Sequence, residues 1–260
     1  MPEGDTVCQT AKRQNEALAG LPLTGFELRV PKFAAADLTG ETVHEVVSIG
    51  KHLFHRIGDW SLHSHLKMEG VWRLVADGQK WPKPAFQARA VLRTASVTSI
   101  GFELGITELL PREEEHAVTD RLGPDLLGGG WSTASAAQAV VRLQSHPETP
   151  VFMAALDQSN LAGIGNVYAN ELCFLRGVLP TTPMAEVDAA ALVSLAHRVM
   201  LANRDRFPRV TTGDPRPGHR TWVYGRTGQA CLRCGAILLG GELGRVGQER
   251  VVTWCPRCQR

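Results

Sequence analysis

The sequence predicts an α+β chain of more than one domain, with a leading helix and an antiparallel β-sandwich, then a helical domain, then a small metal-binding β-hairpin module. Three observations carry this prediction: short alternating runs between about 21 and 127, helical periodicity from about 131 to 210, and two Cys-x-x-Cys pairs near the end. A chain of 260 residues is long enough for a sizeable core and for more than one domain.

The charge of the chain is distributed unevenly. Residues 201–260 contain 11 arginines and four acidic residues, whereas residues 1–200 contain 17 basic and 22 acidic residues. Because the planar arginine fork suits phosphate, we expect a polyanionic partner, although a basic segment can also be simply solvated. No apolar stretch reaches the roughly 18 to 20 residues that span a bilayer, and the first thirty residues carry charges throughout rather than the basic tip and apolar block of a secretory signal. We therefore expect a cytosolic protein without a membrane partner.

The first half of the chain has one helix followed by strands. Apolar residues at helical spacing predict a helix over 5–20, capped by Asp5 and Thr6 and ended by Gly20. Strand-like runs follow at 26–30, 43–49, 52–57, 61–68, 70–75, 88–94 and 96–104. The acidic run 113–115 is typical of a solvated turn.

The second half is helical in period. The segment 123–131 is rich in glycine and indicates a linker, and helices are predicted within 133–145, 149–158, 166–177 and 185–206. The segment 207–220, with three prolines and two glycines, indicates an irregular loop. We therefore expect domains over 1–127, 128–222 and 223–260.

Four cysteines near the end of the sequence form two Cys-x-x-Cys pairs separated by 20 residues: Cys231, Cys234, Cys255 and Cys258. This spacing matches a tetrahedral four-thiolate zinc site joined by a β-hairpin, with redox-active or disulfide pairs as the alternative. A closed four-thiolate shell leaves no position for water, so the expected zinc is structural and no catalytic metal is expected. Arg250 lies five residues before Cys255, on the second strand of the expected hairpin.

A glycine-rich turn separates two of the expected helices. A helix ends near Asp157, Gly163 and Gly165 allow close approach of a ligand to the backbone, and Asn166 stands where a cap residue is expected. The N–H groups at the start of that helix form a natural phosphate site, although an ordinary helix-helix turn would also contain such glycines.

Four separated motifs occur in one order along the chain. They are Met1-Pro2-Glu3-Gly4, then Gly50-Lys51 with the stretch 65–73, then 157–168, then 223–226 with the cysteine pairs. In these residues the chain resembles the formamidopyrimidine-DNA glycosylase and endonuclease VIII (Fpg/Nei) superfamily. The resemblance implies a base excision repair enzyme with a helix-two-turns-helix DNA-binding domain, a monomer acting on damaged duplex, bubble or single-stranded DNA near the bacterial nucleoid.

The resemblance also implies the roles of the first residues. Once Met1 is removed, Pro2 carries a secondary amine, and α-amino groups have pKa values of about 7.7 to 8.0. Pro2 would attack the sugar carbon that carries the damaged base, form an iminium link and drive β,δ-elimination of the flanking phosphates. Glu3 would protonate the opening sugar ring, and Lys51 would contact the phosphate or sugar as a cation.

The same resemblance implies the DNA contacts. Asn166, Arg250 and the turn at Gly165 would bind phosphates around the lesion and bend the duplex, so that the nucleotide leaves the stack. Met68 would insert into the resulting gap, with core packing as its alternative. His63 and His65 share one strand face, but no carboxylate follows at ligand spacing, so we expect surface or hydrogen-bonding histidines rather than a metal site.

Three departures from the superfamily pattern, together with the Gly4 opening and the strand at 70–74, favour the endonuclease VIII branch, and hence oxidised pyrimidines. Thr6 stands where a glutamate is usual, no Arg-Arg-Phe turn occurs in the stretch 101–115, and the loop 207–220 is short. Two alternatives stay open: an oxidised-purine glycosylase of the same architecture, and a zinc-finger DNA-binding protein without catalysis.

Overall fold

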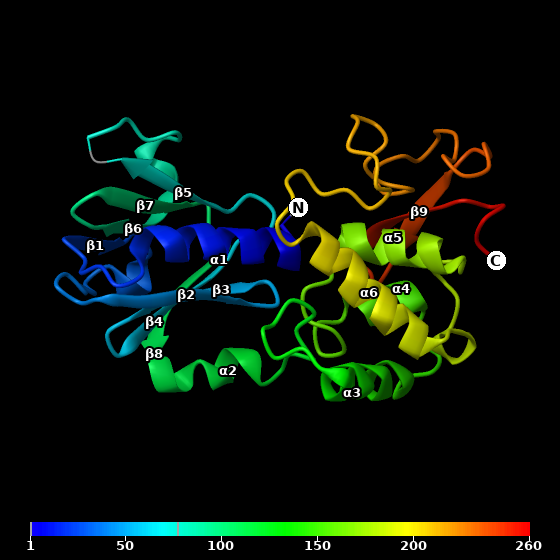
Figure 1. The fold of residues 1–260 in the computed structure, drawn as a ribbon, viewed down its shortest axis with the longest axis horizontal. Helices are drawn as coiled ribbons and strands as arrows, with labels where there is room; N and C mark the ends of the chain where they lie inside the picture. The colour runs from blue at the N-terminus through cyan, green and yellow to red at the C-terminus, as the bar shows by residue number, and fades with distance from the viewer. Residues whose placement is uncertain (1, 77) are drawn as a thin grey trace. The chain divides into compact units, whose positions relative to one another are not determined.

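The computed structural model describes residues 2–76 and 78–260, which form two compact units (Figure 1). The first unit ends at Asp120, and the second runs from Arg121 to Arg260. The segment 123–131, expected as a linker, packs within the second unit, where Leu126 is fully buried. Across the described ranges, no helix combines the length and the apolar character that crossing a membrane requires.

The first unit contains one long helix and two four-stranded antiparallel sheets, which confirms the predicted leading helix and antiparallel sandwich, although the strand over 106–111 was not predicted. Helix α1 spans Gly4–Leu18. One sheet has the order β1-β6-β7-β5, with β1 Gly25–Leu28, β5 Val71–Ala76, β6 Ala88–Arg93 and β7 Val97–Phe102. The other has the order β2-β3-β4-β8, with β2 Val43–Ile49, β3 His52–Ile57, β4 Trp60–His65 and β8 Ile106–Pro111.

Helix α1 packs between the two sheets (Figure 1). Its apolar face, including Val7 and Leu18, shares one core with side chains of both sheets. A polar contact fixes the helix on β2, because the backbone N–H of Val46 donates to Oδ1 of Asn15 at 2.8 Å. Helix α1 and strand β2 therefore belong to one well-packed body.

The acidic run 113–115 is only partly solvated, so the expectation of a solvated turn was wrong for its last member. Glu115 is 8% exposed, and it accepts hydrogen bonds from Arg56 and Ser61 on the outer face of the second sheet. Burial raises the pKa of Glu115, but the hydrogen bonds from Arg56 and Ser61 outweigh burial and hold that pKa below its usual value. Sequence spacing alone could not reveal a partner that lies on another strand.

The second unit has a helical part and a hairpin. Its helices are α3 Thr133–Gln144, α4 Val151–Leu156, α5 Asn166–Arg176 and α6 Ala189–Asn203. The short helix α2, His116–Thr119, closes the first unit. The four longer helices share a core to which the partly aromatic face of α5 contributes Tyr168 and Leu172, both fully buried. Figure 1 shows α5 alongside the hairpin strand β9.

The hairpin pairs β9, Leu239–Leu243, with β10, Arg250–Trp254, as the cysteine spacing predicted. Its base packs on α5 through a small apolar cluster that includes Phe174, Val223 and Leu238. The last residues add polar anchors, because Nε2 of Gln259 donates to the carbonyl of Val178 at 2.8 Å. A module too small to have its own core is thus stabilised by the helix beneath it.

Candidate functional site

The start of α1 holds the two residues expected to carry the chemistry. Glu3 is the N-cap residue of α1 and is fully buried, while Pro2 beside it is half-buried. The carbonyl of Glu3 accepts the N–H of Val7 at 3.0 Å, which fixes the backbone at this point. A carboxyl group without solvent contact can take part in proton transfer to a group beside it.

Lys51 lies in the two-residue turn that joins β2 to β3. Ile49 and His52 pair across this turn, and Gly50 has φ 58°, a left-handed conformation that favours glycine. Figure 1 shows this turn at the same end of the first unit as the start of α1. The fold therefore presents Lys51 on a rigid hairpin, at the end of the unit where Pro2 lies.

Met68 stands on the tight turn between β4 and β5 and is 61% exposed. The N–H of Gly70 closes the turn by donating to the carbonyl of Leu66 at 2.9 Å. A Cβ at Gly70 would lie 2.4 Å from that same carbonyl oxygen, so the turn requires glycine there. The alternative of core packing for Met68 does not fit this exposure.

The glycine-rich turn before α5 is held by the amide of Gln158. Its Nε2 donates to the carbonyl of Ile164 at 2.9 Å, and its Oε1 accepts the N–H of Gly163 at 3.0 Å. Gly163 has φ 110°, which a side chain would strain. The sequence motif thus builds a rigid loop in front of the helix.

Asn166 does not cap α5, contrary to the sequence expectation. The N-cap is Gly165, in extended conformation, and Asn166 is already the first helical residue. The side chain of Asn166 is 6% exposed, and its Oδ1 has no hydrogen-bond partner among the described residues. A buried polar atom without a partner costs free energy, so Oδ1 of Asn166 is a candidate acceptor for a donor from outside the chain.

Asn170, one helical turn after Asn166, connects α5 to the hairpin and was missed in the sequence. Its Oδ1 accepts the N–H of Thr253 at 2.7 Å, and its Nδ2 donates to the carbonyl of Val251 at 3.2 Å. Arg250, which is exposed, begins the same strand. Asn170 therefore fixes the strand of Arg250 against the helix of Asn166. The only sign of this role in the sequence is that Asn170 stands four residues, about one helical turn, after the motif residue Asn166.

Glu171 is a second residue that sequence reasoning missed. This fully buried carboxylate accepts the backbone N–H groups of Trp222, Val223 and Tyr224 at 2.8 to 2.9 Å, and it also accepts the hydroxyl of Thr211. Burial raises the pKa of Glu171, and these four donors oppose that rise. One helical side chain thus orders both ends of the loop that precedes the hairpin.

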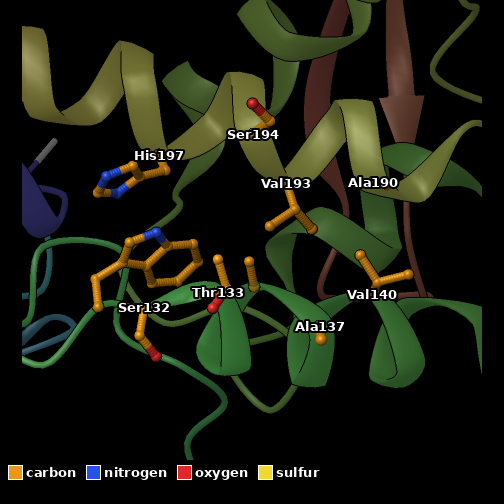
Figure 2. Close-up of a pocket in the computed structure, with 10 residues that line it drawn as sticks. Ser132, Thr133, Ala137, Val140, Ala190, Val193, Ser194 and His197 are labelled. Carbon is orange, nitrogen blue, oxygen red and sulfur yellow. The ribbon is translucent and has the colours of Figure 1, made fainter.

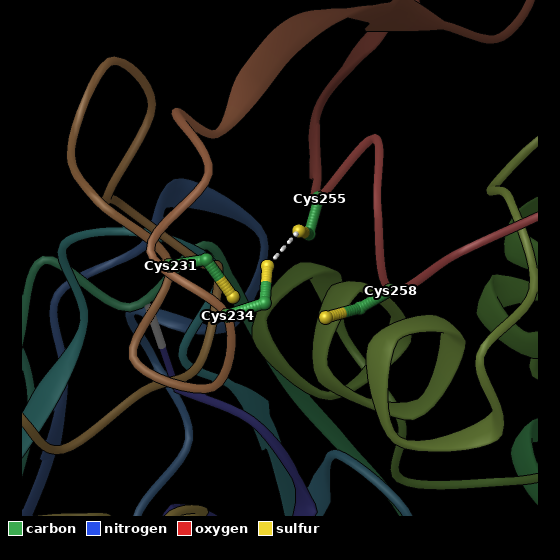
Figure 3. A group of neighbouring side chains, drawn as sticks. All are labelled: Cys231, Cys234, Cys255 and Cys258. Atoms are coloured by element: carbon green, nitrogen blue, oxygen red, sulfur yellow. Dashed lines mark hydrogen bonds between the residues drawn. The ribbon is translucent and has the colours of Figure 1, made fainter.

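The four cysteine thiols converge at the base of the hairpin (Figure 3). Their Sγ atoms all lie within 4.8 Å of one another, and those of Cys234 and Cys255 are 3.4 Å apart. Zinc–thiolate bonds of about 2.3 Å in a tetrahedron require sulfur separations of this size. The donor set, four soft thiolates in a closed group, fits a structural metal ion.

An apolar cavity of about 470 Å³ opens between α3 and α6 in the second unit (Figure 2). Val140 and Val193 line it, and at one end the ring of Trp131 stacks on His197 at 4.8 Å. Nδ1 of His197 bonds to the carbonyl of Leu126 at 2.8 Å. This cavity contains none of the residues that the sequence motifs single out.

The stretch 101–115, which contains no Arg-Arg-Phe sequence, connects the two sheets of the first unit. Strand β7 ends at Phe102, and β8 follows directly from Ile106, paired with β4 along its whole length. Strand β8 therefore occupies the middle of the stretch that lacks the Arg-Arg-Phe turn, between a short connection at 103–105 and a 3-10 helix at 112–114. Thr6, another departure from the superfamily pattern, lies at the start of α1, and its N–H donates a hydrogen bond to Oδ1 of Asp5 at 2.7 Å.

Comparison with known proteins agrees with this architecture. Residues 1–103 match the model of the formamidopyrimidine-DNA glycosylase N-terminal domain. The structure of Lactococcus lactis Fpg bound to DNA containing an abasic site superposes with a TM-score of 0.81 at 22% identity, over 99% of both chains. That fold is the fold of this chain.

Full-length relatives define the family more closely. The chain is 48% identical to endonuclease 8 2 of Mycobacterium tuberculosis over the whole of both chains. It is 47% identical to the DNA-(apurinic or apyrimidinic site) lyase Nei2 of Mycolicibacterium smegmatis, over 100% of this chain and 99% of the relative. Endonuclease 8 of Escherichia coli is 30% identical over the full length of both. The chain belongs to the Fpg/Nei family of DNA glycosylases, as the sequence motifs predicted.

Proposed function

We propose that the protein is an endonuclease VIII-type DNA glycosylase and AP lyase that excises oxidised pyrimidines from damaged DNA. The observation that carries this proposal is the position of Glu3, fully buried at the N-cap of α1 directly beside Pro2. The full-length similarity to proteins named endonuclease 8 and AP lyase supports the same activity.

The proposed reaction begins with the amine of Pro2, freed by removal of Met1. This nitrogen attacks C1′ of the damaged nucleotide while Glu3 protonates the ring oxygen, so the sugar opens and the base leaves. The resulting iminium acidifies the C2′ proton. Loss of that proton expels the 3′ phosphate, and a second elimination expels the 5′ phosphate. Lys51 stabilises the phosphate or sugar as a cation.

In this proposal the second unit contributes contacts to the DNA phosphates. Asn166, whose Oδ1 has no partner among the described residues, and Arg250 contact phosphates around the lesion. The backbone at Gly165 allows a phosphate to approach the start of α5. Met68, exposed on its turn, enters the gap that the extruded nucleotide leaves. The thiols of Cys231, Cys234, Cys255 and Cys258 hold one structural zinc ion, which maintains the hairpin that carries Arg250.

The preference for pyrimidines rests on the sequence of the stretch 101–115. An oxidised-purine enzyme that discriminates the opposite base needs side chains to support the orphaned partner, and this stretch contains no Arg-Arg-Phe sequence to supply them. Extrusion from single-stranded or bubble DNA costs least, so such substrates suit this site.

Borohydride trapping tests the proposed chemistry. An iminium between Pro2 and an abasic sugar is reduced to a stable protein–DNA adduct, whereas a passive DNA-binding protein gives none. We expect Pro2→Gly to weaken trapping and Glu3→Gln to abolish base excision. Glu16→Gln, an exposed glutamate on the same helix, serves as the control and should behave as the wild type. Absence of any adduct with the wild-type protein would contradict the proposal.

Two further measurements complete the test. Mass spectrometry of the adduct reports whether Met1 has been removed and which residue carries the sugar. Duplex and single-stranded oligonucleotides bearing thymine glycol, a hydantoin or 8-oxoguanine report the lesion preference. A strong preference for duplex 8-oxoguanine opposite cytosine would favour the oxidised-purine alternative instead.

A further inference from the structure

A chain of three hydrogen-bonded side chains crosses the outer face of the second sheet of the first unit. Nδ1 of His52 on β3 lies 2.9 Å from Nε2 of His63 on β4, and Nδ1 of His63 lies 3.1 Å from Oε2 of Glu108 on β8. The two imidazole rings stack with centroids 5.1 Å apart. His63 is 2% exposed, so the middle of this His52–His63–Glu108 chain is shielded from solvent.

The sequence could not reveal this chain, because Glu108 is 45 residues from His63. Antiparallel pairing sets His63 opposite Glu108 on the neighbouring strand, on the same face of the sheet. The expectation that His63 is a hydrogen-bonding histidine is consistent with the structure. Its carboxylate partner is not a neighbour in the sequence but Glu108 on the adjacent strand. Among the described residues, only the four cysteines form a group able to hold a metal ion.

Glu108 determines which ring nitrogens carry protons. An ionised carboxylate only accepts hydrogen bonds, so Nδ1 of His63 donates to it. In the neutral ring Nε2 of His63 is then an acceptor, and Nδ1 of His52 must donate to it. The His52–His63–Glu108 chain therefore ends at Nε2 of His52, which carries a lone pair, and no hydrogen bond joins this atom to another described residue.

Positively charged side chains lie around His52, at this end of the His52–His63–Glu108 chain. Burial, followed by the charges of His63, Lys67 and Lys51, lowers the pKa of His52 to about 4, while Glu108 opposes them. Burial and the same two lysines, with His52 and His63, lower the pKa of His65 to about 3. These rings are thus neutral at physiological pH when no anion is present, and an anion beside the two lysines would raise both pKa values.

We propose that the His52–His63–Glu108 chain recognises a DNA phosphate beside Lys51 by taking up a proton as the phosphate binds, an inference that rests on the proposed function. The proton comes from solvent and adds to Nε2 of His52, which then donates a hydrogen bond to a phosphate oxygen. The Nδ1 proton of His52 stays in its bond to His63. The carboxylate of Glu108 balances the imidazolium charge through the ring of His63.

Proton uptake fixes the sign of the pH dependence. Binding that takes up a proton strengthens as the pH falls, by up to about tenfold per pH unit and proton between the free and bound pKa values. Above the pKa that His52 has in the DNA-bound state, the His52–His63–Glu108 chain contributes no pH dependence to binding. The charged and titratable groups around His52 are His63 and His65 of β4, Glu108 of β8, and the flanking Lys51 and Lys67.

The sharpest variant is Glu108→Gln, because an amide keeps a hydrogen-bond acceptor for His63 while it removes the charge. The side chain of Glu108 is 49% exposed, so this change is compatible with folding. The matched control is Glu114→Gln, which removes the same charge from an exposed position in the same unit. A second variant, His63→Phe, breaks the chain and keeps the stack on Phe54, whose ring lies 5.0 Å from that of His63.

Isothermal titration calorimetry tests the proposal with a duplex that carries a tetrahydrofuran abasic analogue, which binds without forming an iminium. Titrations at pH 6.5 in buffers of different ionisation enthalpy count the protons taken up. We expect net uptake by the wild type and by Glu114→Gln, and clearly reduced uptake by Glu108→Gln and His63→Phe. Affinities at pH 8 should agree between Glu108→Gln and its control, and should diverge about tenfold at pH 6.

Two outcomes would overturn the inference: equal proton uptake by the wild type and Glu108→Gln, or parallel pH profiles of Glu108→Gln and Glu114→Gln. Borohydride trapping on an abasic duplex is run on the same samples. If the wild type traps DNA but takes up no proton through this chain, the inference fails and the proposed function stands. If the wild type traps nothing, the proposed function itself fails.

Discussion

Substitution of Asn170 by alanine should uncouple the hairpin from helix α5 and thereby weaken DNA binding through Arg250. The wild-type amide makes three bonds: it accepts the N–H of Thr253 at 2.7 Å and donates to the carbonyls of Val251 and Asn166 at 3.2 and 2.8 Å. Asn170 is fully buried. Each buried partner left without a bond costs about 1 to 3 kcal/mol, so Asn170→Ala should lower the free energy of unfolding by about 2 to 4 kcal/mol.

The chain offers a matched control in Asn203. Its Nδ2 also donates to the carbonyl four residues earlier, Val199, at 2.9 Å. Its two amide atoms also bind one external segment, accepting the N–H of Val210 at 2.8 Å and donating to the carbonyl of Val210 at 3.0 Å. Asn203→Ala should therefore cost a similar free energy of unfolding, while the strand of Arg250 keeps its contact with α5.

A double-mutant cycle separates positioning from stability. Urea unfolding measures the stability of both variants, and binding to a tetrahydrofuran duplex is measured at a temperature where both are folded. We expect Arg250→Ala to weaken binding about tenfold in the wild type and in Asn203→Ala, but much less in Asn170→Ala, because the arginine is already misplaced there. Additive effects of Arg250→Ala and Asn170→Ala would refute the reasoning.

Two further predictions concern stability and metal. His55 is fully buried against Trp72, both its ring nitrogens are unpartnered among the described residues, and burial lowers its pKa to about 3. Because the unfolded chain binds a proton there near pH 6.5, stability should fall as the pH falls below that value, by about 2 kcal/mol at pH 5. His55→Phe should remove this part of the loss and keep the parts due to His52 and His65, whose pKa values are also lowered, as urea titrations at pH 5 and 7.5 would show; an unchanged pH dependence would contradict it. The second prediction is one zinc ion per chain by elemental analysis; chelation should lower the unfolding temperature, whereas loss of chemistry before unfolding would mean that the metal is not structural.

The sequence by itself determined the elements and the order of the modules. The alternation of apolar residues predicted β1 to β7 but missed β8. The helical period predicted α1 and α3 to α6, and the cysteine spacing predicted the hairpin and the thiol cluster, because each of these patterns is local. The motif order was enough to indicate the family that the full-length relatives define.

Only the tertiary structure decided which distant side chains meet. Sheet register brings Glu108 to His63, and helix packing brings Asn170 to the strand of Arg250. The cap of α5 also depended on backbone geometry, since Gly165 is extended and Asn166 is already helical. Such contacts join residues from about 45 to about 80 positions apart, and their distances follow from packing and register, which no local pattern of residues encodes.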